Sequence, residues 1–180
     1  MPRRTPVTSS ASGVRCEARL RYWVAGTPIP QGSKRVWKGP QGQLHMREEA
    51  GVRHTTWRYE LAAQARLAMQ DAGLVTPYRE PIYVALHFTL HRPASHYGTG
   101  KNSERLAPRA PLFPSKPPDI DKLTRAVLDS MTSIVWVDDA QVVRLTATKG
   151  FVHRWQEEGV SINVATYERE DEPSPATIPS

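Results

Sequence analysis

The chain has 180 residues, of which 39% are hydrophobic, enough for the core of one ordinary domain but not of two large ones. Lys and Arg number 24 against 18 Asp and Glu, so the formal net charge is +6, which suits a polyanionic partner. The single cysteine, Cys16, excludes an intramolecular disulfide and every zinc site built from several cysteines, and it fits a reducing cytoplasm.

The two ends of the chain differ in composition from its middle. No apolar run approaches the roughly 20 residues that cross a bilayer, so we expect no membrane span. The first residues are rich in Arg and Ser, which indicates a disordered basic tail, although organelle transit peptides share this composition. We therefore expect a tail over 1–17, a folded domain over 18–167 and a second disordered tail over 168–180.

Apolar alternation predicts a short first strand that runs over 20–24 and ends at Gly26. The segment 27–50 is predicted to be irregular until about Gly51, because two glycines and a proline interrupt it between 39 and 42. Thr55 or Thr56 is expected to cap a first helix that ends at Gly73. The apolar residues of this helix recur at helical spacing and are Trp57, Leu61, Ala65, Ala68 and Met69.

The clearest strand runs over 82–90, where apolar and other residues alternate strictly. A loop with six prolines follows over 92–118, and loops of that length are usually functional or mobile. A second helix is predicted over 120–131. Two further strands are expected to turn alternate residues inward, namely Val143, Leu145 and Ala147, then Val160, Ile162 and Val164. This order predicts a single α+β domain with two helices packed on one face of a small mixed sheet.

Two aspartates precede and open the second predicted helix. Pro117 and Pro118 hold the chain extended before it turns, so Asp119 and Asp121 could aim both carboxylates the same way. Such a pair suits Mg²⁺, which takes one or two carboxylates together with water and substrate phosphate. The alternative is that these aspartates only cap the helix and complement its dipole.

Further acidic and basic residues extend this pattern. Asp138 and Asp139 stand where turn aspartates are common, but Asp139 would complete a three-carboxylate cluster if the next strand lay beside the helix start. Asp121, Arg125 and Asp129 are spaced four residues apart, which indicates either an exposed ladder of ion pairs or an arginine that holds a phosphate.

Three other signals do not predict a site. The segment 98–102 imitates part of a phosphate-binding loop, but its first glycine, its final Ser or Thr and the following helix are absent, so ATP binding is rejected. His87 and His91 could share a strand face, but no cysteine or third ligand is near them to form a zinc site. Cys16 has no base partner for nucleophilic catalysis.

The segments Pro118-Asp119-Ile120-Asp121-Lys122-Leu123 and Val137-Asp138-Asp139-Ala140-Gln141-Val142-Val143 resemble the RusA family of Holliday junction resolvases in residues, order and spacing. The resemblance implies a homodimer that binds four-way DNA junctions by shape and makes paired symmetric nicks with Mg²⁺ or Mn²⁺. It implies that Asp119, Asp121 and Asp139 are catalytic metal ligands and that Asp138 supports them.

Two positions depart from the family pattern. Arg125 stands where some members carry a catalytic lysine, so its role could shift to clamping a phosphate, and Lys122 stands where others have asparagine. Side chains expected to contact DNA are Lys34, Arg35, Trp37, Lys38, Lys116, Lys122 and Lys149.

The role that the resemblance implies is resolution of junctions in DNA recombination and repair, in the cytoplasm of a bacterial cell or phage-infected host. The alternatives are a junction-binding protein that does not cut and a metal-dependent nuclease for flaps or RNA.

Overall fold

The computed structural model describes residues 14–32, 34–38, 40, 42–48, 52–153 and 155–169, without the side chains of 14–17, 34–38, 44–48 and 168–169. The strands are β1 (Val14–Ala25), β2 (Lys34–Lys38), β3 (Leu44–Glu48), β4 (Ile82–His91), β5 (Val142–Val152) and β6 (Gly159–Arg169). The helices are α1 (Val52–Asp71) and α2 (Ile120–Met131). Short 3₁₀ turns span Ala94–His96, Gly100–Asn102 and Asp139–Gln141.

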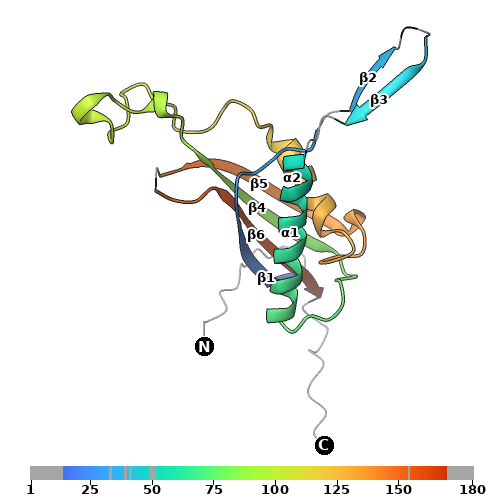
Figure 1. The fold of residues 1–180 in the computed structure, drawn as a ribbon. Coiled ribbons are helices and arrows are strands. Elements are labelled where there is room, and N and C mark those ends of the chain that lie inside the picture. Colours follow the sequence, from blue (N-terminus) through green and yellow to red (C-terminus); the bar gives the residue numbers. More distant parts are fainter. Residues whose placement is uncertain are drawn as a thin grey trace, which may run out of the picture.

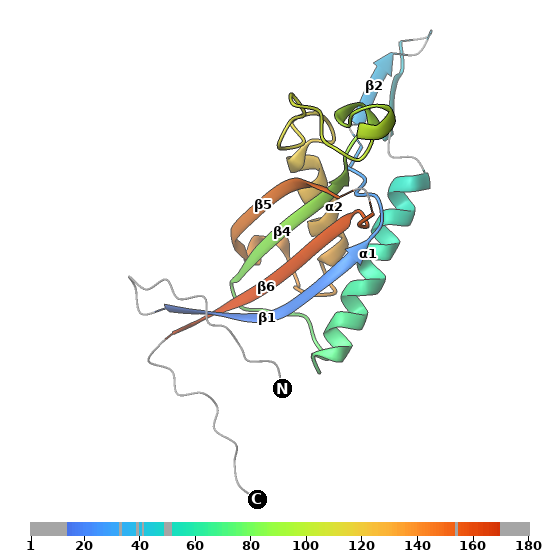
Figure 2. The same ribbon diagram turned by 90° about the vertical axis from the view of Figure 1, so that its left-hand side faces the viewer.

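The main sheet has the strand order β1-β6-β4-β5, in which β4 and β5 are parallel and the other neighbours are antiparallel. Both α1 and α2 lie on one face of this sheet, and the described residues leave its other face bare (Figures 1 and 2). The predicted α+β arrangement of two helices on one face of a small mixed sheet is confirmed. Strand β1 begins before the predicted domain boundary at 18, and its partner β6 ends beyond the predicted boundary at 167. The two predicted tails lie largely outside the described residues.

Helix α1 begins earlier than predicted. Thr56 is not a cap but lies inside the helix, where its hydroxyl donates to the carbonyl of Val52, four residues before it, at 3.1 Å. The predicted end is confirmed: Gly73 has a φ of +71°, and the next N–H, that of Leu74, donates to the carbonyl of Met69 at 2.9 Å. The predicted apolar stripe faces the core, with Trp57, Leu61, Ala65 and Met69 buried and Ala68 packed against them.

The alternation of apolar residues correctly predicted the inward-facing residues of β4 and β6 but not those of β5. The apolar residues of β4 and β6 are buried at Ile82, Val84, Leu86, Phe88, Leu90, Val160, Ile162 and Val164. In β5 the prediction was wrong for Val143 and Leu145, which are 61% and 43% exposed, whereas Ala147 is half-buried against the core. Strand β5 is at the sheet edge. A register shift near its start leaves Val143 without a paired residue in β4.

The predicted irregular segment 27–50 contains a hairpin. Strands β2 and β3 pair antiparallel in a second, two-stranded sheet, and Figure 1 shows this hairpin standing away from the main sheet. The glycine and proline residues that were expected to prevent regular structure lie in the connection between the strands, where Gly42 has a φ of +80°. Turn-forming residues between two short strands were therefore misinterpreted as a broader break.

The direction of α2 decides where the functional residues lie. The connection from β4 to the parallel strand β5 passes through the 92–118 loop and α2, which brings the start of α2 near the end of β5 and the end of α2 near the start of β5. The core face of α2 buries Leu123, Ala126, Val127, Ser130 and Met131, as predicted. No described helix is long and apolar enough to span a bilayer.

Candidate active site and nucleic-acid interface

Asp119 and Asp121 lie at the start of α2, and the side chain of Asp119 does not cap it. Asp119 occupies the N-cap position with extended backbone angles (φ −72°, ψ 135°), but its carboxylate accepts no capping hydrogen bond. One of its oxygens, Oδ2, instead lies 3.2 Å from Nζ of Lys122. Asp121 is exposed in the first helical turn. Two solvent-accessible carboxylates separated by a single residue therefore fit the donor set that Mg²⁺ takes.

Lys149 fixes the segment that leads into these aspartates. Its ammonium group donates to the carbonyl of Lys116 at 3.0 Å and to the carbonyl of Pro118 at 2.8 Å. Lys149 lies on β5, so these two bonds join the sheet to the backbone immediately before Asp119. Because an ammonium group has three donors, one remains for another acceptor. Sequence reasoning proposed Lys149 for DNA contact and missed this positioning role.

The ladder of ion pairs along α2 is not formed. Arg125 is exposed and has no ion pair with Asp121 or Asp129 within the described residues. Asp129 instead accepts a hydrogen bond from the side-chain amide of Gln31 at 2.9 Å, and the N–H of Gln31 donates to the carbonyl of Lys122. The guanidinium of Arg125 thus remains available one helical turn after Asp121, with about 5–6 Å expected between their Cβ atoms.

The carboxylate of Asp139 is held by two donors at the other end of α2. Its Oδ1 accepts from the hydroxyl of Thr132 at 2.5 Å and from the indole N–H of Trp136 at 2.8 Å. Trp136 is fully buried, so its ring is fixed by the core. Both donors bind one oxygen, which leaves Oδ2 of Asp139 for another ligand. No motif predicted Thr132 or Trp136, because they carry no charge and act only through the folded geometry.

Asp138 has a local structural role that matches the turn interpretation. Its carboxylate accepts from the N–H of Ala140 at 2.7 Å, and the side chain of Gln141 accepts in return from the N–H of Asp138 at 2.8 Å. This reciprocal capping box fixes the 3₁₀ turn that carries Asp139. The amide of Gln141 also donates to the carbonyl of Tyr78 at 2.9 Å. A part of Asp138 in metal binding stays a prediction.

Two tyrosines lie near this end of α2 and remain neutral at physiological pH. Burial raises the pKa of Tyr78, with Arg19 acting against that rise and Glu80 adding to it. Burial also raises the pKa of Tyr22 well above its usual value, and its hydroxyl donates to the sulfur of Met131 at 2.8 Å. Neither hydroxyl is therefore ionised near neutral pH, so neither can act as a base there.

The three aspartates do not converge within one protomer. Asp119 precedes the first residue of α2, whereas Asp139 is hydrogen-bonded to Thr132, which follows the last. A helix of 12 residues is about 18 Å long, so the two carboxylates stand at opposite ends of it. No group of three possible metal ligands from His, Cys, Asp and Glu occurs among the described residues. The condition for a three-carboxylate cluster, that β5 begins beside the start of α2, is therefore not met within one chain.

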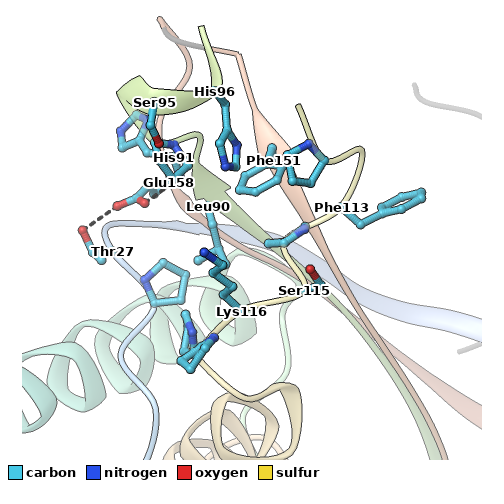
Figure 3. Close-up of a pocket in the computed structure, with 16 residues that line it drawn as sticks. Thr27, Leu90, His91, Ser95, His96, Phe113, Ser115, Lys116, Phe151 and Glu158 are labelled. Carbon is cyan, nitrogen blue, oxygen red and sulfur yellow. Dashed lines mark hydrogen bonds between the residues drawn. The ribbon is translucent and has the colours of Figure 1, made fainter. Parts of the chain in front are cut away.

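A pocket of about 390 Å³ opens next to the start of α2. It lies between the 92–118 loop, the ends of β4 and β5, and the segment after β1, as Figure 3 shows. Its lining includes Leu90, His91, Phe151 and the chain from Phe113 to Pro118. The pocket was not predicted, because its walls come from segments far apart in the sequence.

The predicted DNA contacts are distributed over three places. Lys34, Arg35, Trp37 and Lys38 form β2, whose side chains lie outside the described residues, although the backbone register pairs Arg35 with Arg47 and Trp37 with His45. Lys116 is exposed and lines the pocket, and Lys122 is partly exposed beside Asp119. Lys149 is half-buried. Their contact with DNA stays a prediction.

Two comparisons with known proteins found similarities to this chain, one to a family model and one to a single protein. The model of the family described as "Endodeoxyribonuclease RusA" matches residues 25–165. The chain is also similar to the "Uncharacterized protein YqaN" of Bacillus subtilis (strain 168), with 25% identity over 131 residues, which cover 72% of this chain and 86% of that protein. Both ends of α2, the pocket and the main part of the sheet lie inside the matched region.

Proposed function

The chain belongs to the RusA endodeoxyribonuclease family, and on this premise we propose that it resolves four-way DNA junctions by paired symmetric nicks in DNA recombination and repair. The observation that carries the proposal is the exposed pair of Asp119 and Asp121, neither of which is used by a capping hydrogen bond. The net charge of +6 supports a DNA substrate, since each neutralised phosphate releases counterions.

In the proposed site, Asp119 and Asp121 hold Mg²⁺, with Mn²⁺ as the alternative ion. A divalent ion held there would supply Lewis acidity for activating water and for stabilising charge on the scissile phosphate. Lys149 holds the backbone before Asp119 and so sets the position of its carboxylate. Arg125 binds a phosphate oxygen through its guanidinium, because it is exposed, has no ion pair among the described residues and lies one helical turn after Asp121.

Asp139 requires a second protomer if it is to act with the other two aspartates. Within one chain it stands at the far end of α2. In a dimer with a two-fold axis perpendicular to α2, the two copies of this helix run antiparallel, so the start of one can face the end of the other. A homodimer would also supply the two active sites that paired nicks require. The proposed site therefore combines Asp119 and Asp121 of one protomer with Asp139 of its partner.

The first test uses a labelled four-way junction and a matched linear duplex, each with Mg²⁺ or with EDTA. We expect nicks in the junction alone and only with Mg²⁺. Asp121→Asn should lower the cleavage rate by on the order of 10³-fold while junction binding in EDTA is retained, because the fold keeps its basic surface but the ion loses a ligand. Asp71→Asn, at the exposed end of α1, is the matched control and should cleave as the unchanged protein does.

Each alternative activity gives a different result in the same experiment. Junction binding without cleavage at any Mg²⁺ concentration would identify a non-catalytic binding protein and would contradict the proposal. Preferred cleavage of a flap or of an RNA duplex, added as competitors, would move the substrate class away from four-way junctions. Equal cleavage of the linear duplex would remove the selectivity for branched DNA.

A further inference from the structure

The residues that line the pocket next to α2 include Pro118, which immediately precedes the proposed metal ligand Asp119. Lys116, Pro117 and Pro118 form part of its lining, and the following residue is Asp119. Neighbouring Cα atoms in a trans peptide are about 3.8 Å apart. A DNA strand whose scissile phosphate lay at Asp119 would therefore place a neighbouring nucleotide close to this lining.

The walls of the pocket are suited to a flat, apolar ring. They are formed by Leu90, Phe151 and the proline residues 28, 93, 111, 114, 117 and 118. The ring of Phe151 is fixed, since the guanidinium carbon of Arg92 lies 4.2 Å from its centroid and the ring of His96 meets it edge-on at 5.5 Å. Aromatic and apolar walls of this kind bind the faces of nucleobases without requiring a particular sequence.

The polar groups of the pocket favour the edge of a base over a phosphate. Both oxygens of Glu158 are fixed, one by the N–H of His91 at 2.7 Å and the other by the hydroxyl of Thr27 at 2.6 Å. Each carboxylate oxygen can accept a further hydrogen bond from a base amino or imino group, whereas a phosphate would be repelled. Lys116 supplies donors from the opposite side, as Figure 3 shows.

His96 adds an unmet hydrogen-bonding atom to this lining. Its Nδ1 is buried and has no hydrogen-bond partner within the part of the chain that the structure describes. Buried polar atoms in folded proteins are nearly always paired, so such an atom is expected where a partner arrives with a ligand. The volume of about 390 Å³ is within the range of pockets that take small organic groups.

From these features we infer that the pocket holds one unstacked nucleobase of the cleaved strand, next to the scissile phosphate. The inference rests on the proposed function, because it requires DNA at Asp119. It goes beyond that function by assigning a base-binding site and a structural reason for selecting branched DNA. Bases at a branch point are more easily unstacked than bases inside a continuous duplex, so only branched DNA offers the pocket an occupant at low cost.

The experiment places 5-iododeoxyuridine, a photo-crosslinking base, at single positions within two nucleotides of the mapped cleavage site of a four-way junction. The complex is formed in EDTA, so that no strand is cut during irradiation, and the crosslinked peptides are identified by mass spectrometry. We expect one position to crosslink to the peptides that carry His96, Phe113 or Phe151, and no crosslinks to them from the matched linear duplex.

A second arm fills the pocket without touching the proposed catalytic residues. Ser115 is exposed and lines the pocket, so Ser115→Trp places an indole inside it. We expect this variant to lose the crosslink and to bind the junction about tenfold more weakly, which corresponds to about 1.4 kcal/mol. Ala63→Trp, on the exposed face of α1, carries the same added ring away from the pocket and should bind as the unchanged protein does.

The two proposals fail in distinguishable ways. Crosslinks that map outside the pocket, or unchanged junction affinity of Ser115→Trp, would overturn the base-binding site while leaving junction cleavage intact. A protein that neither binds nor cuts four-way junctions would overturn the proposed function, and the base-binding site with it.

Discussion

The two ends of α2 position their carboxylates by different means. At the far end, the side chain of Asp139 is held directly by Thr132 and Trp136. At the start, the described residues supply no such donors to Asp119 and Asp121 apart from the surface lysine beside Asp119, and the backbone before them is held instead by Lys149. One end therefore has a carboxylate held by buried and neighbouring donors, and the other has a fixed backbone with exposed carboxylates.

This difference indicates how the work is divided in the proposed dimeric site. A fixed carboxylate costs little further ordering when a ligand binds, whereas exposed carboxylates with few partners can adjust to an ion that is shared with substrate phosphate and water. The fixed end would thus define where the ion binds, and the adjustable end would accommodate the DNA. Variants at both ends together, and then at each end separately, would test this division.

The largest expected effect is recovery of activity from two inactive variants. Asp119→Asn and Asp139→Asn are each expected to abolish cleavage. If Asp139 acts in the partner's site, a mixed dimer of the two variants has one site with both substitutions and one intact site. Mixing them under conditions that exchange subunits should therefore restore single-strand nicks, measured on a nicking substrate.

The same mixture is inactive if the three aspartates act within one chain, because each site of the mixed dimer then carries one substitution. Absence of nicks, with subunit exchange demonstrated by differently tagged chains, would contradict the shared site. A monomer in light scattering at micromolar concentration would also contradict it.

An intermediate effect is expected at the fixed end. Thr132→Val removes the hydroxyl that donates to Asp139 and keeps the shape of the side chain, so cleavage should fall by about 10- to 100-fold and the Mg²⁺ concentration for half-maximal rate should rise. Thr132→Ser keeps the hydroxyl and should restore most of the activity. Equal loss in both variants would indicate that the methyl group, and hence packing, is responsible.

The smallest effect is expected at the adjustable end. Lys149→Met keeps a long side chain but removes the bonds to the carbonyls before Asp119, so the cleavage rate should fall by about tenfold while unfolding by heat changes little. Lys101→Met, at an exposed lysine of the 92–118 loop, is the matched loss of one charge. If both variants lose junction affinity equally and cleave normally at saturation, Lys149 contributes charge only.

Local sequence signals predicted the position of α2 accurately. Pro118 disfavours helical backbone angles at Pro117, and the apolar spacing after the two prolines is helical, so α2 was predicted with its observed bounds. Gly73 ended α1 for a similarly local reason. The hairpin β2–β3 was missed because glycine and proline interrupt regular structure in both a loop and a tight turn.

The position of Asp139 could not be predicted locally. Ten residues, 132–141, separate α2 from β5, and an extended chain of that length spans about 33–36 Å, enough to return along the whole helix. The folded chain uses these residues on local turns instead, with Trp136 paired to Thr132 and to Tyr78. The choice depends on burial of Trp136 against segments distant in the sequence, which no local pattern encodes.

The sheet order also governs when the protein can acquire its fold during synthesis. Strand β6 is the last along the chain but lies between β1 and β4, and it supplies the pairing partner of β1 along the whole of that first strand. A nascent chain on the ribosome that has not reached residue 159 therefore holds α2 and its aspartates without the strand that joins the two halves of the sheet. Prematurely terminated chains would consequently lack the folded core, so a DNA-cutting activity would be withheld until translation of β6 is complete.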